Sequence, residues 1–288
     1  MADAPLPTFT TLRLTRLGDY AVEVALNRPR KSNAIDSAMW RELRACFEAL
    51  AALDWLRVVL LTGGDSKNFC AGIDLADLQS GLALGIGVGR PSEDDPDAAR
   101  RALRIRQHIL YLQGAFDAIE ALPVPVVAVV HGACFGGAID LITACDVRWA
   151  AAGSRFSVKE VDIGLCADVG TLARLPKVIG SQSLVRELCL TGREFEADEA
   201  LGCGLVSKLC ASRDALQREA AALAAAIAAK SPLAIAGTKA NLLYARDHGV
   251  AEANRYTALW NAAGLQSDDL GEAAAARSER RAPVFARL

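Results

Sequence analysis

Histidine is scarce in this chain of 288 residues, and its cysteines are not paired in sequence. The three histidines, His108, His131 and His248, are scattered, and none of the eight cysteines belongs to a C-x-x-C pair. Most of the cysteines lie in apolar runs. We therefore predict no metal site and expect reduced, buried thiols in an intracellular protein rather than disulfides or zinc.

A long apolar run is also lacking. No stretch reaches the ~18 residues of a membrane span, and the alanine-rich run at 220–229 predicts a short buried helix. The N-terminus carries Asp3 and two prolines without a long apolar region, so we expect no secretory signal. Neither sign of charge dominates, because 32 basic and 34 acidic side chains leave a formal net charge of −2. We expect no general attraction to nucleic acid or to an anionic membrane.

Hydrophobic residues make up 52% of the sequence, which is enough for a sizeable core. Strand-like runs alternate with helical patterns, which predicts an α/β protein of repeated strand–strand–helix units. Strands are predicted at Thr11–Leu17, Ala21–Leu26, Arg57–Thr62, Val126–Val130, Asp146–Trp149, Ser154–Val158 and Leu205–Cys210. Helices are predicted from an Asp36 cap to about Leu53, at Ala98–Leu122, within Gly132–Ala144, near Gly170–Lys177, Ser181–Leu190 and Ala197–Cys203, and throughout the chain after Arg213.

Residues 80–97 differ in composition from their surroundings. Four glycines, at positions 81, 85, 87 and 89, precede an acidic stretch bounded by Pro91 and Pro96. This composition predicts a flexible, solvent-facing loop or lid. A phosphate-binding loop is not favoured, because no strand leads in and no Gly-Lys-Ser/Thr follows.

Two glycine-bearing turns lie between a buried strand and a predicted helix. The first is the turn at 70–75 (Cys-Ala-Gly-Ile-Asp-Leu), and the second is the turn at 131–138, which contains Gly132, Gly136 and Gly137. A helix start presents unpaired N–H groups, so two such turns side by side can direct two donors at one oxygen. The alternative is tight packing between strand and helix that merely requires small residues.

Three carboxylates follow the second glycine-bearing turn in the sequence. Asp140 lies one turn into the helix that begins at Gly136-Gly137, and Glu160 and Asp168 flank a glycine-containing loop. Their neighbours are apolar. They are either surface charges on half-buried elements or desolvated acids suited to proton transfer near neutral pH. The residues by themselves do not rank these two interpretations.

A resemblance to a known family distinguishes between these two interpretations. The stretch Val126–Lys177 resembles the crotonase (enoyl-CoA hydratase/isomerase) superfamily, with residues 71–75 matching its first oxyanion segment and residues 136–138 its second. The stretches at 136–142, 159–165 and 167–172 resemble one branch of it, the 3,5-2,4-dienoyl-CoA isomerases. The resemblance extends from about residue 8 to the end. A hydratase is expected to carry Glu at position 140 and no acid at 168.

The resemblance implies a fold, a domain organisation and a set of site residues. The implied fold is a spiral of ββα repeats, with a catalytic core at 8–210 and a C-terminal helical trimerisation region at 211–288. The implied catalytic residues are Asp140, Glu160 and Asp168, with the backbone N–H groups of Ile73 and Gly137 as the oxyanion hole. Substrate and coenzyme A are expected to contact Ala71, Gly72, Ile73, Asp74, Leu75 and Gly137, with Lys177 and Lys239 as candidates for the phosphates.

The same resemblance implies partners and a cellular location. No separate cofactor is expected, because coenzyme A is part of the acyl-CoA substrate. A homotrimer or a hexamer built as a dimer of trimers is expected. The ending Ala286-Arg287-Leu288 resembles a peroxisomal address, so we favour a peroxisome-like organelle over mitochondrion or cytoplasm.

Two other functions stay open at the level of sequence. One is a 2-enoyl-CoA hydratase in which Asp140 and Glu160 activate water, although Asp168 then has no obvious part. The other is a binding protein of the crotonase fold without catalysis, which the near-zero net charge and the complete carboxylate set disfavour.

Overall fold

The computed structural model describes residues 5–79 and 97–288 of the chain. All but the last residue of the loop predicted at 80–97 therefore lies outside the described residues. Within them a six-stranded sheet runs in the order β1 (Leu12–Leu17), β2 (Ala21–Leu26), β3 (Val58–Thr62), β4 (Val126–Val130), β6 (Val147–Ala151) and β9 (Lys208–Cys210). The first pair is an antiparallel hairpin formed by the first two predicted strands, and the other neighbours are parallel.

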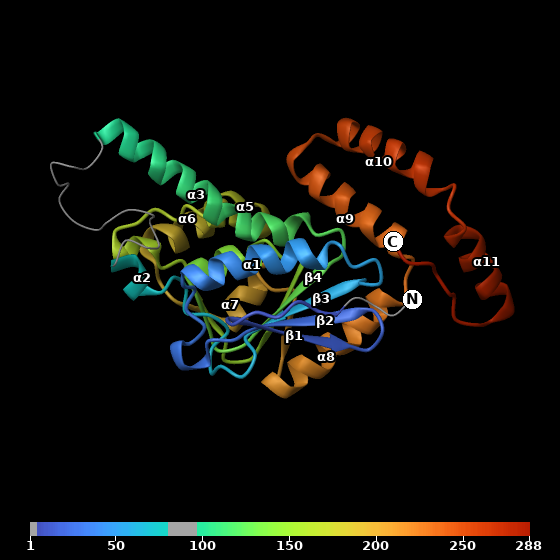
Figure 1. Cartoon of the computed structure of the whole chain (residues 1–288), viewed down its shortest axis with the longest axis horizontal. Helices are drawn as coiled ribbons and strands as arrows, with labels where there is room; N and C mark the ends of the chain where they lie inside the picture. The colour runs from blue at the N-terminus through green and yellow to red at the C-terminus, as the bar shows by residue number, and fades with distance from the viewer. Residues whose placement is uncertain (1–4, 80–96) are drawn as a thin grey trace.

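Both faces of this sheet are covered by helices, as the continuous apolar strands predict. Successive side chains of a strand point to opposite faces, so β3 contributes Val59 and Leu61 to one core and Val58 and Leu60 to the other. On the first face lie α1 (Ser37–Leu50) and α3 (Ala98–Ala121); on the second lies α8 (Arg213–Ala228) (Figure 1). The Asp36 carboxylate caps α1 by accepting a hydrogen bond from the Met39 N–H, as predicted.

A second sheet of three short strands lies at the carboxyl ends of the central strands. It consists of β5 (Ala133–Phe135), β7 (Arg155–Ser157) and β8 (Phe195–Glu196). The sequence predicted that the turn within Gly132–Ala144 leads directly into a helix. This is wrong, because the strand β5 precedes the helix. The strand β8 was not predicted. Strands of two or three residues are too short to show a period of two.

Among the described residues, two 3-10 helices and five short α-helices lie between the strands along the chain. They are the 3-10 helices η1 (Pro29–Lys31) and η3 (Glu160–Ile163) and the helices α2 (Leu75–Gln79), α4 (Gly137–Thr143), α5 (Thr171–Val178), α6 (Gln182–Thr191) and α7 (Ala197–Gly202). Of these, α4 contacts β5, and α7 contacts β7 and β8. The four predicted helices in this region begin and end within a few residues of these bounds.

Three C-terminal helices, α9 (Pro232–Asp247), α10 (Val250–Gly264) and α11 (Asp269–Glu279), form an arm beside the core (Figure 1). Ser231 caps α9 and Pro232 is its first residue. The helix α8 lies beyond residue 210 but packs on the sheet through Leu216, and α9 still contacts the core through the buried Lys239. In the described ranges no single helix is long and apolar enough to span a membrane. The pair α8 and α9, bent by 106°, meets that test of length and composition only when taken together.

Candidate active site

The two glycine-bearing turns lie side by side, as predicted. The Cys70 N–H donates to the Ala133 carbonyl at 3.1 Å, and the Phe135 N–H donates to the Cys70 carbonyl at 3.1 Å. Gly72 follows with a φ of +90°, and a Cβ atom there would lie 2.7 Å from the Phe135 carbonyl oxygen. Only glycine permits both this backbone conformation and this close approach.

The same pairing leaves two backbone donors open. Ile35 donates to the Gly72 carbonyl and accepts from the Asp74 N–H, so the N–H of Ile73 between them faces the opposite side. In the described part of the chain, neither the Ile73 N–H nor the Gly137 N–H has a hydrogen-bond acceptor. A Cβ atom at Gly137 would lie 3.9 Å from the Ile73 nitrogen. Both residues line a cavity of about 230 Å³, which therefore contains two neighbouring, unpaired donors.

Glu160 lines the same cavity from the start of η3. Its side chain lies against the turn that carries the donors, because a Cβ atom at Gly136 would be 3.1 Å from Glu160 Oε1. Its other oxygen, Oε2, is buried and has no hydrogen-bond partner among the described residues. An unpartnered, buried carboxylate oxygen beside open N–H donors is unusual outside functional sites.

Asp140 is fully buried one turn into α4. Its Oδ1 accepts a hydrogen bond of 2.5 Å from the Thr171 N–H at the start of α5, while Oδ2 is buried without a partner among the described groups. The positive end of the α5 dipole thus faces this carboxylate. Asp168 lies three residues before Thr171 and is only half-buried. The Gln113 side chain on α3 donates to its backbone carbonyl at 2.6 Å.

The three acids form one electrostatic group. Burial raises the pKa of Glu160 to about 7, and repulsion from Asp140 and Asp168 adds to the shift. Burial also raises the pKa of Asp140 to about 6, against the hydrogen bond from Thr171. Burial raises the pKa of Asp168 as well, and the nearby His108 opposes this. Near neutral pH such a group holds and exchanges protons.

Only some of the other predicted contact residues line the cavity. Ala71, Gly72 and Leu75 line the cavity, but the Asp74 side chain does not and instead pairs with Arg28 at 3.0 Å. Lys239 is buried, donates to the Val124 carbonyl and pairs with Asp146 at 2.8 Å. The prediction that Lys239 meets a phosphate is therefore wrong, because its charge is already neutralised in the core.

Other residues at the site were not predicted from the sequence. Phe135, Lys159, Asp162 and Ile163 complete the lining of the cavity. Lys159 and Asp162 pair across one turn of η3, a spacing that the sequence contains but that many surface pairs share.

The second phosphate candidate, Lys177, is half-exposed and pairs with Asp247 at 3.0 Å.

The fold and the site together define a protein of the crotonase fold. A family model described as enoyl-CoA hydratase/isomerase matches residues 19–87 and 104–287. An enoyl-CoA hydratase structure from Bacillus anthracis superposes with a TM-score of 0.83 at 26% identity, covering 96% of this chain and 99% of that one. The chain therefore belongs to the enoyl-CoA hydratase/isomerase family.

More similar relatives carry a narrower name. The chain is 46% identical over 281 residues to a mitochondrial Delta(3,5)-Delta(2,4)-dienoyl-CoA isomerase from Homo sapiens, covering 98% of this chain and 83% of the relative. It is 40% identical to a peroxisomal isomerase of the same name from Arabidopsis thaliana, covering 98% of this chain and 99% of the relative. The resemblance seen in the sequence motifs thus extends over nearly the whole chain.

Proposed function

We propose that this protein isomerises 3,5-dienoyl-CoA to 2,4-dienoyl-CoA in fatty acid β-oxidation. The observation that carries the proposal is the third carboxylate. Glu160 lines the cavity that contains the two open backbone donors, and Asp140 and Asp168 both lie near enough to raise the pKa of Glu160, although neither of them lines the cavity. The name shared by relatives at 40–46% identity supports the same activity.

The open donors are assigned to the thioester oxygen. When the proton at carbon 2 leaves, negative charge develops on this oxygen, and the N–H groups of Ile73 and Gly137 stabilise it. Because the donors are held by the backbone, they need no reorganisation during the reaction. Loss of one such donor typically costs about 2.7–4 kcal/mol of transition-state stabilisation.

The proton then has to be replaced at a distant carbon. Glu160 breaks the C2–H bond by accepting the proton, and the electron pair spreads over the two double bonds as a dienolate. Asp168 donates a proton to carbon 6, which moves the double bonds to positions 2 and 4. Glu160 ends protonated and Asp168 ionised, so exchange with solvent restores both before the next turnover.

Asp140 is assigned an accessory role. Its buried carboxyl is fixed by the Thr171 N–H and raises the pKa of Glu160. It therefore helps Glu160 to hold the proton between the two transfer steps. The acyl-CoA is expected to contact the turn at 71–75, and coenzyme A enters and leaves as part of the substrate, without a separate cofactor.

The direct test of the activity is a substrate panel at equal enzyme concentration. With 3,5-dienoyl-CoA we expect the strong ultraviolet absorbance of a conjugated 2,4-dienoyl-CoA to develop, and slower or no reaction with 3-enoyl-CoA and 2-enoyl-CoA. Asp168→Asn should remove nearly all of the 3,5-dienoyl-CoA signal. Faster loss of 2-enoyl absorbance than gain of dienoyl absorbance would identify a hydratase instead.

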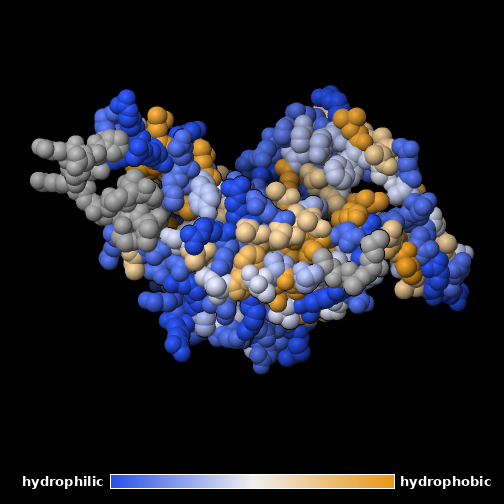
Figure 2. All heavy atoms as spheres, viewed as in Figure 1, coloured by the Kyte–Doolittle hydropathy of each residue, from blue (hydrophilic) through white to orange (hydrophobic). Residues whose placement is uncertain are grey.

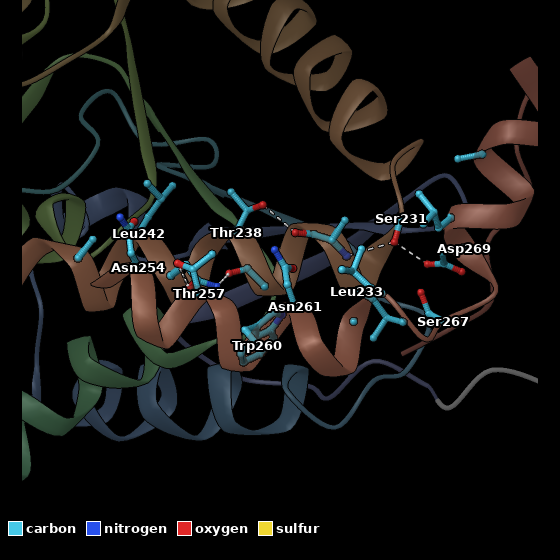
Figure 3. A pocket seen from close by; sticks show the side chains of 18 of the residues that line it. Ser231, Leu233, Thr238, Leu242, Asn254, Thr257, Trp260, Asn261, Ser267 and Asp269 are labelled. Atoms are coloured by element: carbon cyan, nitrogen blue, oxygen red, sulfur yellow. Dashed lines mark hydrogen bonds between the residues drawn. The ribbon is translucent and has the colours of Figure 1, made fainter. Parts of the chain in front are cut away.

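We also propose that the arm of α9–α11 is an assembly surface, giving a trimer or a dimer of trimers. A pocket of about 550 Å³ lies between these helices, and Trp260, Leu233 and Leu242 point into it (Figure 3). Figure 2 shows hydrophobic residues exposed along this arm. The exposed hydrophobic residues of α9–α11 and their connections include Leu242, Val250, Leu259, Leu265 and Leu270, each at least 60% exposed. A subunit that left these side chains in water would carry a large apolar surface.

We propose a location in the mitochondrion or the peroxisome. The relatives named above are mitochondrial in one case and peroxisomal in the other.

A further inference from the structure

One face of α3 is directed at the segment that carries Asp168. Gln113, Asp117 and Glu120 are spaced by four and three residues, so their side chains share a face of the helix. Gln113 Nε2 donates to the Asp168 carbonyl at 2.6 Å. The carboxylates of Asp117 and Glu120 both pair with Arg174 of α5, at 2.6 and 3.3 Å.

Arg174 links the polar face of α3 to the residues that follow Asp168. Its guanidinium is almost completely buried and lies against Gly170, where a Cβ atom would overlap it. Gly170 has a φ of +141° and caps α5, whose first N–H group holds Asp140. The backbone from 168 to 171 is therefore fixed at three points, of which two originate on the polar face of α3.

The carboxylate of Asp168 has much less support than its backbone. In the described part of the chain no side chain donates a hydrogen bond to it, although the nearby His108 lowers its pKa against the effect of burial. The other two acids are different, because Glu160 is buried against Gly136 and Asp140 is held by Thr171. The position of the Asp168 carboxylate is consequently set by where its main chain is held.

We propose that Gln113 is a positioning residue for the isomerisation, which acts by holding the main chain of Asp168 so that its carboxyl reaches the distal carbon. This inference rests on the proposed function. A reacting group displaced by about 1 Å can lose about a hundredfold in rate. Gln113 contacts the carbonyl and not the carboxylate, so it acts through Asp168 and needs no contact with the substrate.

The test compares Gln113→Leu with Gln107→Leu, a matched change on the exposed part of the same helix. Leucine keeps the size of the side chain but cannot donate. Two rates are measured in D₂O for each full-length variant, the formation of 2,4-dienoyl-CoA and the exchange of deuterium into carbon 2 of unreacted 3,5-dienoyl-CoA. Asp168→Asn supplies the ratio of exchange to product formation that results when Asp168 itself is disabled. Thermal unfolding of each variant accompanies these rates.

Gln113→Leu should lower product formation about ten- to a hundredfold. It should also move the ratio of exchange to product formation in the direction seen for Asp168→Asn, with Gln107→Leu like wild type. An unchanged rate, or a fall in both rates by the same factor, overturns the inference, because the second result indicates general damage to the site. Failure of the wild-type protein to convert 3,5-dienoyl-CoA at all instead refutes the proposed function.

Discussion

At the scale of single residues, burial distinguishes the catalytic candidates from ordinary surface acids. Asp140, Glu160 and Asp168 were all found in the sequence, but their apolar neighbours suited a half-buried surface equally well, and family resemblance was needed to group them. The structure shows that Asp140 and Glu160 are buried while Asp168 is only half-buried. Spacing in a sequence does not report such three-dimensional enclosure.

Burying Glu160 has a cost in stability that depends on pH. Its pKa is about 7 in the folded protein and about 4.5 when exposed, so the folded state binds more protons between these values. Below pH 4.5 the carboxyl is protonated in both states and this cost is absent. The cost grows, and the free energy of unfolding falls, as pH rises through 7. Glu160→Gln should therefore raise the free energy of unfolding at pH 8 by about 1–3 kcal/mol, with a smaller gain at pH 5.

Denaturant unfolding of both proteins at pH 5, 6, 7 and 8 measures this difference. The mutant's advantage should grow steadily over that range. An advantage that stays constant with pH would mean that the Glu160 carboxyl is not the desolvated acid described above.

At the scale of elements, the two turns work because glycine permits a close approach of main chains. The sequence predicted both turns and their proximity to one oxygen. It missed β5, although this strand connects the turns by pairing Ala133 and Phe135 with Cys70. The three residues of β5 show no alternation, and the strand forms by pairing with β7 and with Cys70, both distant in the sequence, which a local pattern cannot reveal.

Gly72→Ala tests this arrangement. The new methyl group would meet the Phe135 carbonyl, so the main chain must shift and separate the Ile73 and Gly137 donors. We expect kcat for dienoyl isomerisation to fall by about a hundredfold or more, as for loss of an oxyanion donor. Gly153→Ala is the control, because Gly153 also has a positive φ of +77° but has open space around it. Equal losses of activity in the two variants would show that backbone strain, not donor geometry, explains the effect.

At the scale of the whole molecule, the chain consists of a well-covered core and an arm with exposed apolar residues. The sequence predicted the helical character of the chain after Arg213. It predicted a short buried helix at 220–229, within α8, but the family resemblance assigned all residues after 210 to the trimerisation region. A helix that packs on a sheet and one that packs on another subunit both present an apolar face, so the sequence did not distinguish the two.

Light scattering at micromolar concentration tests the proposed assembly. We expect a mass of three or six subunits for the wild type and a smaller mass for Leu259→Asp, in which a charge is placed on the arm. Leu190→Asp is the control, because Leu190 on α6 is 76% exposed and Leu259 is 75% exposed. A wild-type monomer, or an unchanged mass for Leu259→Asp, would contradict the assignment of the arm as the interface.

The central claim is that two different carboxyl groups handle the protons at carbons 2 and 6. The most direct measurement follows deuterium from 3,5-dienoyl-CoA labelled at carbon 2 into the product formed by the wild-type enzyme in ordinary water. The mechanism predicts 2,4-dienoyl-CoA in which carbon 6 has gained hydrogen from solvent, with no deuterium transferred from carbon 2. Deuterium recovered at carbon 6 would show that one group carries the proton along the acyl chain, and would contradict the assignment of Glu160 and Asp168 to separate steps.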